Sequence, residues 1–386
     1  MQVGLVGKPS SGKSSFFKAL TMVDVAIAEF PFTTIQPNVG VGYVTKDCVC
    51  KRLNVKCKPN NSICEDGVRK IPVKLIDVAG LVPDAHKGKG MGNQFLDDLS
   101  RASCLIHIVD VSGTTDSEGK KTEGHDPSKD VEFLEEEIDL WFAGIIQKAI
   151  EKFTKKMKFS KDVNLTEILA EQLAGLGIKK SDIAKSIDKF DADNLLEFAK
   201  DIRHNTKPII IAANKIDLEK ADSNFENLKK GFLGSAIIPT SAVAEIALKT
   251  AEKNSLIKYG NGKIEILKEL PDNQKKGLEF IDKNILKKYG STGIQACLNK
   301  AVFEVLDYIA VYPVADINKL ADNKGNVLPD VFLMKKGSTL KDLAFEVHST
   351  MAEKFIGGIE VNKKMKLGAD YILKDSDVIQ ILFQKR

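Results

Sequence analysis

The sequence contains no apolar run of the roughly 18 residues that a membrane-spanning helix needs. Its N-terminus lacks the basic and apolar regions of a secretory signal peptide. Aromatic residues make up only 7% of the 386 positions, with a single tryptophan among them. These absences exclude a membrane-embedded class and favour a cytoplasmic globular protein, in which the six cysteines are expected to be reduced. A chain of this length is expected to form two or three domains.

The net charge of +4 is small but unevenly distributed. Residues 113–205 carry more acidic than basic side chains, so the rest of the chain is more basic than the total indicates. A mild basic excess is compatible with an RNA partner, although a solvated, lysine-rich surface accounts for it more simply. Neither DNA nor a membrane is expected as a partner, and a monomer is the default expectation.

A phosphate-binding loop is predicted near the N-terminus. The segment GKPSSGKS, residues 7–14, fits the pattern G-x-x-x-x-G-K-[ST] between a strand-like run and a helical pattern. The glycines let backbone N–H groups turn toward phosphate oxygens, Lys13 is expected to reach the β- and γ-phosphates, and Ser14 to bind Mg²⁺. An ordinary glycine-rich turn is the alternative. The residues expected at the phosphates are Gly7, Lys8, Pro9, Ser10, Ser11, Gly12, Lys13, Ser14 and Ser15.

A second strand-like run, residues 71–76, ends in the sequence DVAG. An aspartate at the end of a strand beside a phosphate loop can hold a Mg²⁺ water, which is the role expected of Asp77. The amide of Gly80 is expected to contact the γ-phosphate. Between these two motifs, a threonine can close on Mg²⁺ and the γ-phosphate. Spacing alone leaves Thr33 and Thr34 as candidates.

A third apolar run ends in the sequence NKID, and this motif selects the base. The carboxylate of Asp217 can only accept hydrogen bonds, and guanine offers it two donors, whereas adenine leaves it unpaired at a cost of roughly 1–3 kcal/mol. Lys215 is expected to pack along the base and Asn214 to tie this loop to the phosphate loop. Ser241 and Ala242 follow a fourth run and are expected to face guanine O6. The alternative is a loop with a helix N-cap at Asp217.

Three further segments complete a pattern that resembles the Obg-type GTPases, specifically the YchF (Obg-like) group in its archaeal-style form. They are FPFTTIQPNVG at 30–40, DVAGLV at 77–82 and KGKGMGNQF at 87–95. The resemblance implies that Thr34 is the switch threonine. It also implies a ribosome or RNA partner. The expected magnesium ligands are Ser14, Thr34 and Asp77, and the expected catalytic residues are Lys13, Thr34 and Gly80.

Three positions bear on hydrolysis and on the choice of nucleotide. Ser10 stands where many relatives have an asparagine associated with potassium-assisted hydrolysis, which leaves potassium dependence open. Leu81 stands in place of the glutamine that positions water in Ras-like proteins, a substitution that the family shares, so intrinsic hydrolysis is expected to be slow. Many YchF proteins have lost the terminal aspartate of the base motif and prefer ATP, whereas the intact motif ending in Asp217 favours GTP here.

The expected fold is an α/β P-loop G domain over residues 1–112 and 206–310, with a helical or coiled-coil insertion at 113–205. The segments NVLPDVFLM at 326–334 and KGSTLKDLAFEVH at 336–348 are similar to a TGS domain, which implies a small ubiquitin-like α+β fold over residues 311–386. The insertion carries apolar residues at helical spacing, and the polar stretch 112–129 is expected to be a mobile linker. Residues 243–310 are expected to be mostly helical. The apolar stripe of the insertion comprises Val131, Leu134, Ile138, Trp141, Ile145, Ala149 and Phe153.

Four cysteines, Cys48, Cys50, Cys57 and Cys64, lie within 17 residues. A zinc site is conceivable, but C-x-C with six-residue spacers differs from the usual knuckle and no histidine lies nearby. Reduced thiols in a β-hairpin are therefore the expectation, with zinc as the alternative.

The sequence thus predicts a Mg²⁺-dependent protein that binds GTP and hydrolyses it slowly to GDP and phosphate as a conformational switch. A YchF-like ATPase and a nucleotide-gated binding protein with incidental hydrolysis remain as alternatives.

Overall fold

The structure, a computed structural model, describes residues 1–22, 38–78, 92–157, 164–191, 193–260, 262–348, 354–362 and 364–384. The described residues form two compact units, each with its own hydrophobic core. The first unit contains 1–22, 38–40 and the described part of 74–297, and the second contains 41–73 and the described part of 298–386. The hairpin region 41–73 therefore groups with the C-terminal region, whereas the predicted insertion lies within the first unit. No described helix is both long enough and apolar enough to cross a bilayer.

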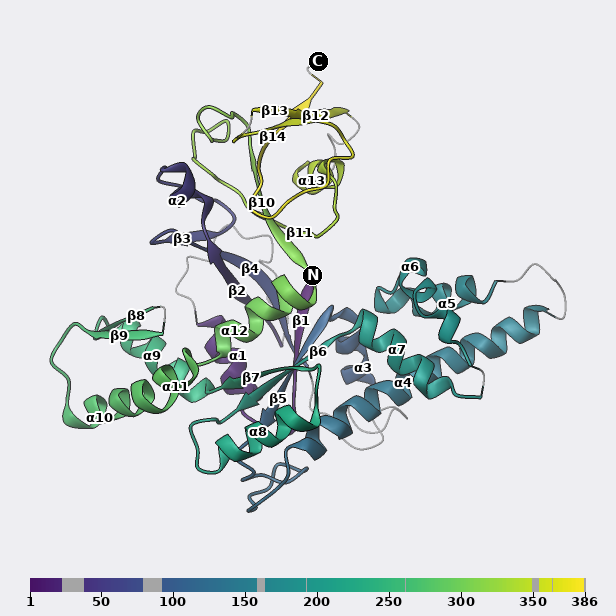
Figure 1. Ribbon diagram of the computed structural model, residues 1–386, viewed down its shortest axis with the longest axis vertical. Helices are drawn as coiled ribbons and strands as arrows, with labels where there is room; N and C mark the ends of the chain where they lie inside the picture. The colour runs from purple at the N-terminus through teal and green to yellow at the C-terminus, as the bar shows by residue number, and fades with distance from the viewer. Residues whose placement is uncertain are drawn as a thin grey trace. The chain divides into compact units, whose positions relative to one another are not determined.

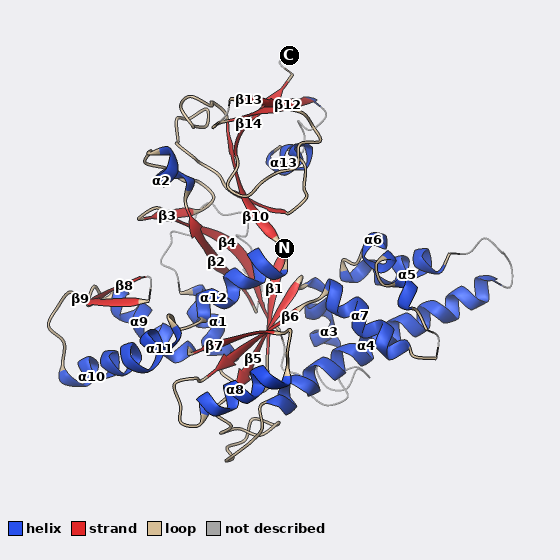
Figure 2. Ribbon diagram, viewed as in Figure 1, coloured by secondary structure: helices blue, strands red, loops and turns tan. Residues whose placement is uncertain are grey.

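The first unit is built on a parallel sheet, as the α/β prediction requires. Its strands lie in the order β4-β1-β5-β6-β7, and every neighbouring pair is parallel (Figures 1 and 2). All seven residues of β5 are buried, as expected for a central strand covered on both faces. The strands are β1 (Gln2–Val6), β4 (Val68–Asp77), β5 (Cys104–Asp110), β6 (Ile209–Asn214) and β7 (Ala236–Thr240).

Two further strands extend this sheet. β2 (Val39–Asp47) neighbours β4, and β3 (Ile63–Glu65) pairs with β4 in antiparallel orientation. The residues of β2 and β4 are divided between the two units. Asp66 and Gly67 connect β3 to β4 with positive φ angles of 48° and 72°, which is the geometry of a two-residue hairpin turn.

Helices surround the sheet of the first unit. Phe95 and Leu99 of α3 and Phe198 of α7 share one apolar core with sheet residues such as Val6 and Leu105. The helices that directly precede or follow the strands include α1 (Lys13–Thr21), α3 (Gly92–Arg101), α7 (Leu195–Thr206), α8 (Ala221–Gly231) and α9 (Ala242–Lys253). Cys104 and His107 on β5 are both buried.

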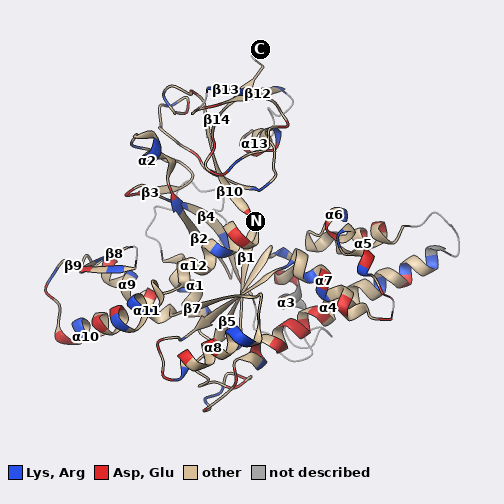
Figure 3. Cartoon of the chain, in the orientation of Figure 1, with Lys and Arg blue, Asp and Glu red and all other residues tan. Residues whose placement is uncertain are grey.

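The predicted insertion is helical. It consists of α4 (Ser128–Met157), α5 (Leu165–Leu173), α6 (Lys180–Ala184) and α7, with single 3₁₀ turns at Ala174–Leu176 and Ile187–Lys189. The acidic residues of α4 lie mainly in its first half and the basic residues in its second half, which complements the helix dipole (Figure 3).

The buried stripe of α4 differs from the predicted one. Phe142 and Ile146 are fully buried, whereas their predicted neighbours Trp141 and Ile145 are only partly buried. The ring of Trp141 packs edge-on against Phe142, with 5.3 Å between centroids.

The segment after β7 is less helical than predicted. It includes α9, α10 (Asp272–Ile281), α11 (Lys287–Tyr289) and α12 (Ile294–Asn299), with π-helical turns at Asp282–Leu286 and Lys300–Val305. Between α9 and α10 it also contains an antiparallel hairpin, β8 (Ile257–Gly260) and β9 (Lys263–Ile266), that the sequence did not reveal.

The second unit contains a five-stranded sheet in the order β11-β10-β14-β12-β13, crossed by one helix. Leu340 and Leu343 of that helix pack on Val311 and Ile379 of the sheet. Thr339 and Asp342 form a capping box at the helix N-terminus. The elements are α2 (Val49–Leu53), β10 (Tyr308–Val314), β11 (Phe332–Lys335), α13 (Leu340–Val347), β12 (Phe355–Glu360), β13 (Met365–Leu367) and β14 (Val378–Phe383). The sheet begins at Tyr308, before the expected domain boundary at 311.

Candidate functional site: a phosphate loop and a base-binding loop around one pocket

The carboxyl ends of the five parallel strands meet at one edge of the sheet. This edge is where ligands bind in open α/β folds. A pocket of about 610 Å³ lies there, and both predicted nucleotide-binding loops contribute to it. Its lining consists of Lys8, Pro9, Ser10, Gly12, Lys13, Ser14, Ser15, Asn214, Lys215, Asp217, Leu218, Ala242 and Val243.

The phosphate loop needs its glycines for close packing. Gly12 has φ 95°, and a Cβ placed there would lie 2.3 Å from Asn214 Nδ2. A Cβ on Gly7 would lie 2.6 Å from the carbonyl oxygen of Ile108 on β5. Ser11 is fully buried beneath the loop. The loop therefore packs against both β5 and the base-binding loop, and helix α1 begins directly after it.

Two of the predicted phosphate and magnesium residues contact each other. The ammonium group of Lys13 forms an ion pair with the carboxylate of Asp77 at the end of β4. The backbone N–H of Asp77 donates to the carbonyl of Asn38, 2.7 Å away. Ser14 lines the pocket at the first turn of α1. A cation, a carboxylate and a hydroxyl thus lie around the amino end of α1.

Asn214 ties the two loops together. Its Nδ2 donates to the carbonyl of Ser11 at 2.9 Å, and its Oδ1 accepts from the backbone N–H of Ala242 at 3.2 Å. Asn214 is 2% exposed, so the loss of either bond leaves a buried polar group unpaired. Ser241 is also buried and caps α9 by accepting from the N–H of Ala244. These contacts hold the loops at fixed separation around the pocket.

The two charged residues of the base motif, Lys215 and Asp217, have different surroundings. Lys215 has φ 64°, and its ammonium donates to Asp110 Oδ2 at 2.7 Å. Asp217 is partly exposed and lines the pocket. Among the described residues, none forms a hydrogen bond or ion pair with the Asp217 carboxylate. Its acceptor oxygens are therefore open to a ligand in the pocket.

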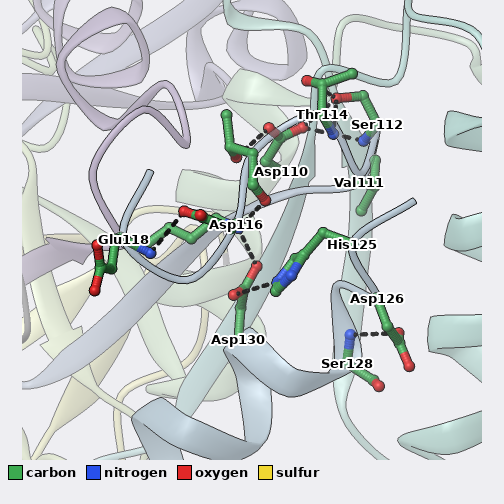
Figure 4. A network of polar contacts seen from close by, with 12 residues as sticks. Asp110, Val111, Ser112, Thr114, Asp116, Glu118, His125, Asp126, Ser128 and Asp130 are labelled. Atoms are coloured by element: carbon green, nitrogen blue, oxygen red, sulfur yellow. Dashed lines mark hydrogen bonds and ion pairs between the residues drawn. The ribbon is translucent and has the colours of Figure 1, made fainter. Parts of the chain in front are cut away.

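The sequence missed a polar network beside the phosphate loop (Figure 4). Asp110, at the end of β5, has no exposed surface and accepts from Ser112, Thr115 and Lys215. Burial favours its neutral form, but these donors outweigh it and lower the pKa of Asp110. The sequence signal that could have revealed Asp110 is an aspartate at the end of an apolar strand, the same pattern that singled out Asp77.

Residues 112–129 are an ordered part of this network rather than the predicted mobile linker. Lys8 donates to the carbonyl of Thr115 at 2.7 Å and pairs with Asp130 Oδ2 at 2.8 Å. His125 Nε2 lies 2.9 Å from the other oxygen of Asp130 (Figure 4). Lys8 thus lines the pocket but has its ammonium fixed by Asp130. The linker prediction was wrong because the contacts of Lys8 with Thr115 and Asp130 join residues more than 100 positions apart.

Several predicted site residues lie outside the described residues. They are Thr33, Thr34, Gly80 and Leu81. Their roles therefore remain predictions from the sequence. Of the other predicted residues, Gly7, Ser11, Asp77 and Ser241 support the pocket without lining it.

Comparisons with known proteins show the family to which the chain belongs. Residues 2–139 match the family described as 50S ribosome-binding GTPase, and 212–316 match the G4 motif-containing domain of the YGR210-like Obg-like GTPases. Residues 324–383 match the TGS domain. A GTP-binding protein of Methanocaldococcus jannaschii is 51% identical over 389 residues, which cover 98% of each chain. The chain belongs to the Obg-like GTPase family.

Other members of the family are similar over nearly the whole chain. The crystal structure of a GTP-binding protein from Pyrococcus horikoshii has a TM-score of 0.80 and 39% identity, and the match covers all of both chains. The ribosome-binding ATPase YchF of Escherichia coli O157:H7 is 26% identical over 98% of each chain. The predicted resemblance to the YchF group, with a P-loop G domain and a C-terminal TGS domain, is confirmed.

Proposed function

We propose that this GTP-binding protein hydrolyses GTP slowly in a Mg²⁺-dependent reaction and acts as a conformational switch. The observation that carries the proposal is the pocket that joins the phosphate loop to Asp217. The open carboxylate of Asp217 matches the two donors of guanine, and the loop amides and Lys13 match the phosphates.

The site fits a magnesium ion by the chemistry of its donors. Mg²⁺ prefers hard oxygen ligands and keeps part of its water shell. The hydroxyl of Ser14 and the carboxylate of Asp77 supply such oxygens beside Lys13. An ion held there would supply positive charge to the phosphate oxygens. Lys13 exchanges its carboxylate partner for those oxygens and stabilises the charge that develops during transfer to water.

The switch residues are inferred from the sequence motifs. In this proposal Thr34 and Gly80 contact the γ-phosphate and separate from it after hydrolysis. Leu81 offers no group to orient water, so hydrolysis is slow until a partner assists. The names of relatives such as the ribosome-binding ATPase YchF support the ribosome as that partner.

An ATPase is the second candidate, because YchF relatives are named ATPases. Adenine offers no donor to the Asp217 carboxylate in the geometry that guanine uses, which favours GTP by roughly 1–3 kcal/mol. Since about 1.4 kcal/mol corresponds to a tenfold change in affinity, the preference is measurable.

Calorimetry with GTP and ATP in the presence of Mg²⁺ tests the proposal on the wild type, Asp217→Ala and Glu219→Ala. The control removes an exposed carboxylate from the same segment, outside the pocket. We expect GTP to bind at least about tenfold more tightly than ATP, and only Asp217→Ala to lose this preference. Equal or tighter binding of ATP to the wild type contradicts the GTP assignment. Phosphate release with and without ribosomes then tests the slow, partner-assisted hydrolysis.

A further inference from the structure

The four cysteines that the sequence left as free thiols come together in the second unit. The sulfur atoms of Cys48, Cys50, Cys57 and Cys64 all lie within 4.8 Å of one another. Those of Cys50 and Cys64 are 3.9 Å apart. This separation is far beyond the roughly 2.05 Å of a disulfide bond. All six cysteines of the chain are free.

The distances match a tetrahedral metal centre. Four sulfurs at the zinc–sulfur distance of about 2.3 Å lie about 3.8 Å from each other in a regular tetrahedron. The geometry points to a structural zinc ion held by Cys48, Cys50, Cys57 and Cys64. Thiolates are soft ligands that select zinc over magnesium or calcium. Sulfurs this close suit a single ion, because the ligands of an iron–sulfur cluster bind different iron atoms.

Local backbone structure presents the four sulfurs to one point. Cys48 precedes α2 and its N–H donates to the carbonyl of Gly67 in the β3–β4 turn. Asn54 ends α2 with φ 50°, and the N–H of Val55 donates back to the carbonyl of Cys50. The chain therefore reverses after α2, so that the loop carrying Cys57 returns toward Cys64 on β3. This path accounts for the C-x-C spacing of Cys48 and Cys50 and for the six residues that separate each of the later cysteines from the one before.

A buried cation supports the assignment independently. Arg69 has no exposed surface, and its Nε has no hydrogen-bond partner. Its other nitrogens donate to Ser62 Oγ and to the carbonyl of Leu328, and its guanidinium lies 5.3 Å from the ring centroid of Tyr312. Among the described carboxylates, Asp330 interacts with its charge but forms no ion pair with it. A buried guanidinium is costly without a negative partner. A zinc ion with four thiolates carries a formal charge of about −2 and supplies one.

The centre would tie the hairpin region to the C-terminal part of the same unit. Beyond Cys57, the N–H groups of Lys58 and Asn60 donate to the carbonyls of Val327 and Pro329. Arg69 adds its bond to Leu328. The loop that holds one ligand is therefore hydrogen-bonded to residues 327–331, and the role assigned to the metal is structural.

Metal analysis of untagged protein, purified with a reductant and without added metal, tests the proposal. We expect about one zinc ion per chain in the wild type. The variant Cys57→Ser, whose residue is partly exposed, should lose zinc affinity by at least about 100-fold. The control Cys297→Ser removes a buried thiol outside the cluster and should keep the ion.

Cobalt substitution identifies the ligands. Co²⁺ bound by four thiolates gives visible d–d bands and near-ultraviolet charge-transfer absorption, which we expect in the wild type and in Cys297→Ser but not in Cys57→Ser. A wild type without zinc and without these bands overturns the proposal. So does zinc retained equally by both variants, or a disulfide between cluster cysteines in mass spectra of the native protein. The wild-type outcomes do not depend on the folding of any variant.

Discussion

Asp110 shows how one buried residue links the fold to the nucleotide site. It lies at the end of β5 with no exposed surface, and Lys215 of the base motif provides its cationic partner at 2.7 Å. A side chain predicted to pack along the base is thus also positioned by a carboxylate from another strand. Lys8 of the phosphate loop is also positioned by a distant carboxylate, because Asp130 of α4 fixes its ammonium group. Both lysines are positioned by residues that no local motif contains.

Substitution of this carboxylate should destabilise the protein in a pH-dependent way. We expect Asp110→Asn to cost about 3 kcal/mol at pH 7, the low end for breaking a buried ion pair, because Lys215 is partly exposed. The pKa of Asp110 is lowered in the folded state, so its contribution is present above the unfolded value of about 3.9 and is lost as pH falls through the folded value.

Urea denaturation of wild type and Asp110→Asn from pH 7 to pH 3 measures this difference. The gap in unfolding free energy should stay constant down to about pH 5 and narrow below pH 4. A difference in unfolding free energy that is the same at pH 7 and pH 3 would contradict a lowered pKa of Asp110 in the folded protein.

At the scale of elements, short sequence motifs predicted the two loops whose binding chemistry depends on residues adjacent in the chain. The phosphate loop and NKID each follow a buried strand, and their glycine and polar residues are those that phosphate and base binding require. The buried face of α4 was displaced by one residue at Phe142 and Ile146, because a stripe over 30 residues drifts and the partner helices decide its final position.

Long-range contacts account for features that the sequence did not reveal. The order of residues 112–129 depends on Lys8 and Asp130, and the four cysteines converge only because α2 and the β3–β4 hairpin fold around them. The β8–β9 hairpin also went unnoticed, since its strands are only four residues each. Spacing along the sequence contains little of this information.

We expect the turn between α11 and α12, which is distant in the sequence, to help hold the base-binding loop in place. Thr292 accepts from the N–H of Ser241 through its carbonyl, and its hydroxyl donates to Glu245 of α9 at 2.5 Å. A Cβ on Gly293 would lie 2.0 Å from the carbonyl of Pro239 on β7. No side chain fits there unless the turn moves away from the strand.

The pair Gly293→Ala and Gly290→Ala isolates this contact. Both glycines have positive φ, 78° and 81°, but nothing lies within 4 Å of a Cβ on Gly290. We expect about 1–2 kcal/mol for Gly290→Ala from backbone strain alone. Gly293→Ala should cost about 2–5 kcal/mol, because overpacking adds to that strain. Equal losses in urea denaturation would show that the turn is not held against β7.

At the scale of the whole molecule, each unit has a ligand site made from its own residues. The nucleotide pocket is lined by residues of the first unit, and the four cysteines belong to the second. A ligand stabilises the state that binds it, and within that state it most strongly suppresses opening of the segments it contacts. Nucleotide and metal should therefore protect different parts of the chain.

Hydrogen exchange read by mass spectrometry makes this prediction specific. GTP with Mg²⁺ should slow exchange at residues 7–15 and 214–217, with little change at 48–64. Removal of the metal by a thiol-compatible chelator should speed exchange at 48–64 and 327–331, since the carbonyls of Val327 and Pro329 accept from the cysteine loop. Readdition of Zn²⁺ should slow exchange at these residues again in the wild type but not in Cys57→Ser. Equal responses of both regions to either ligand would instead mean that the two units open together.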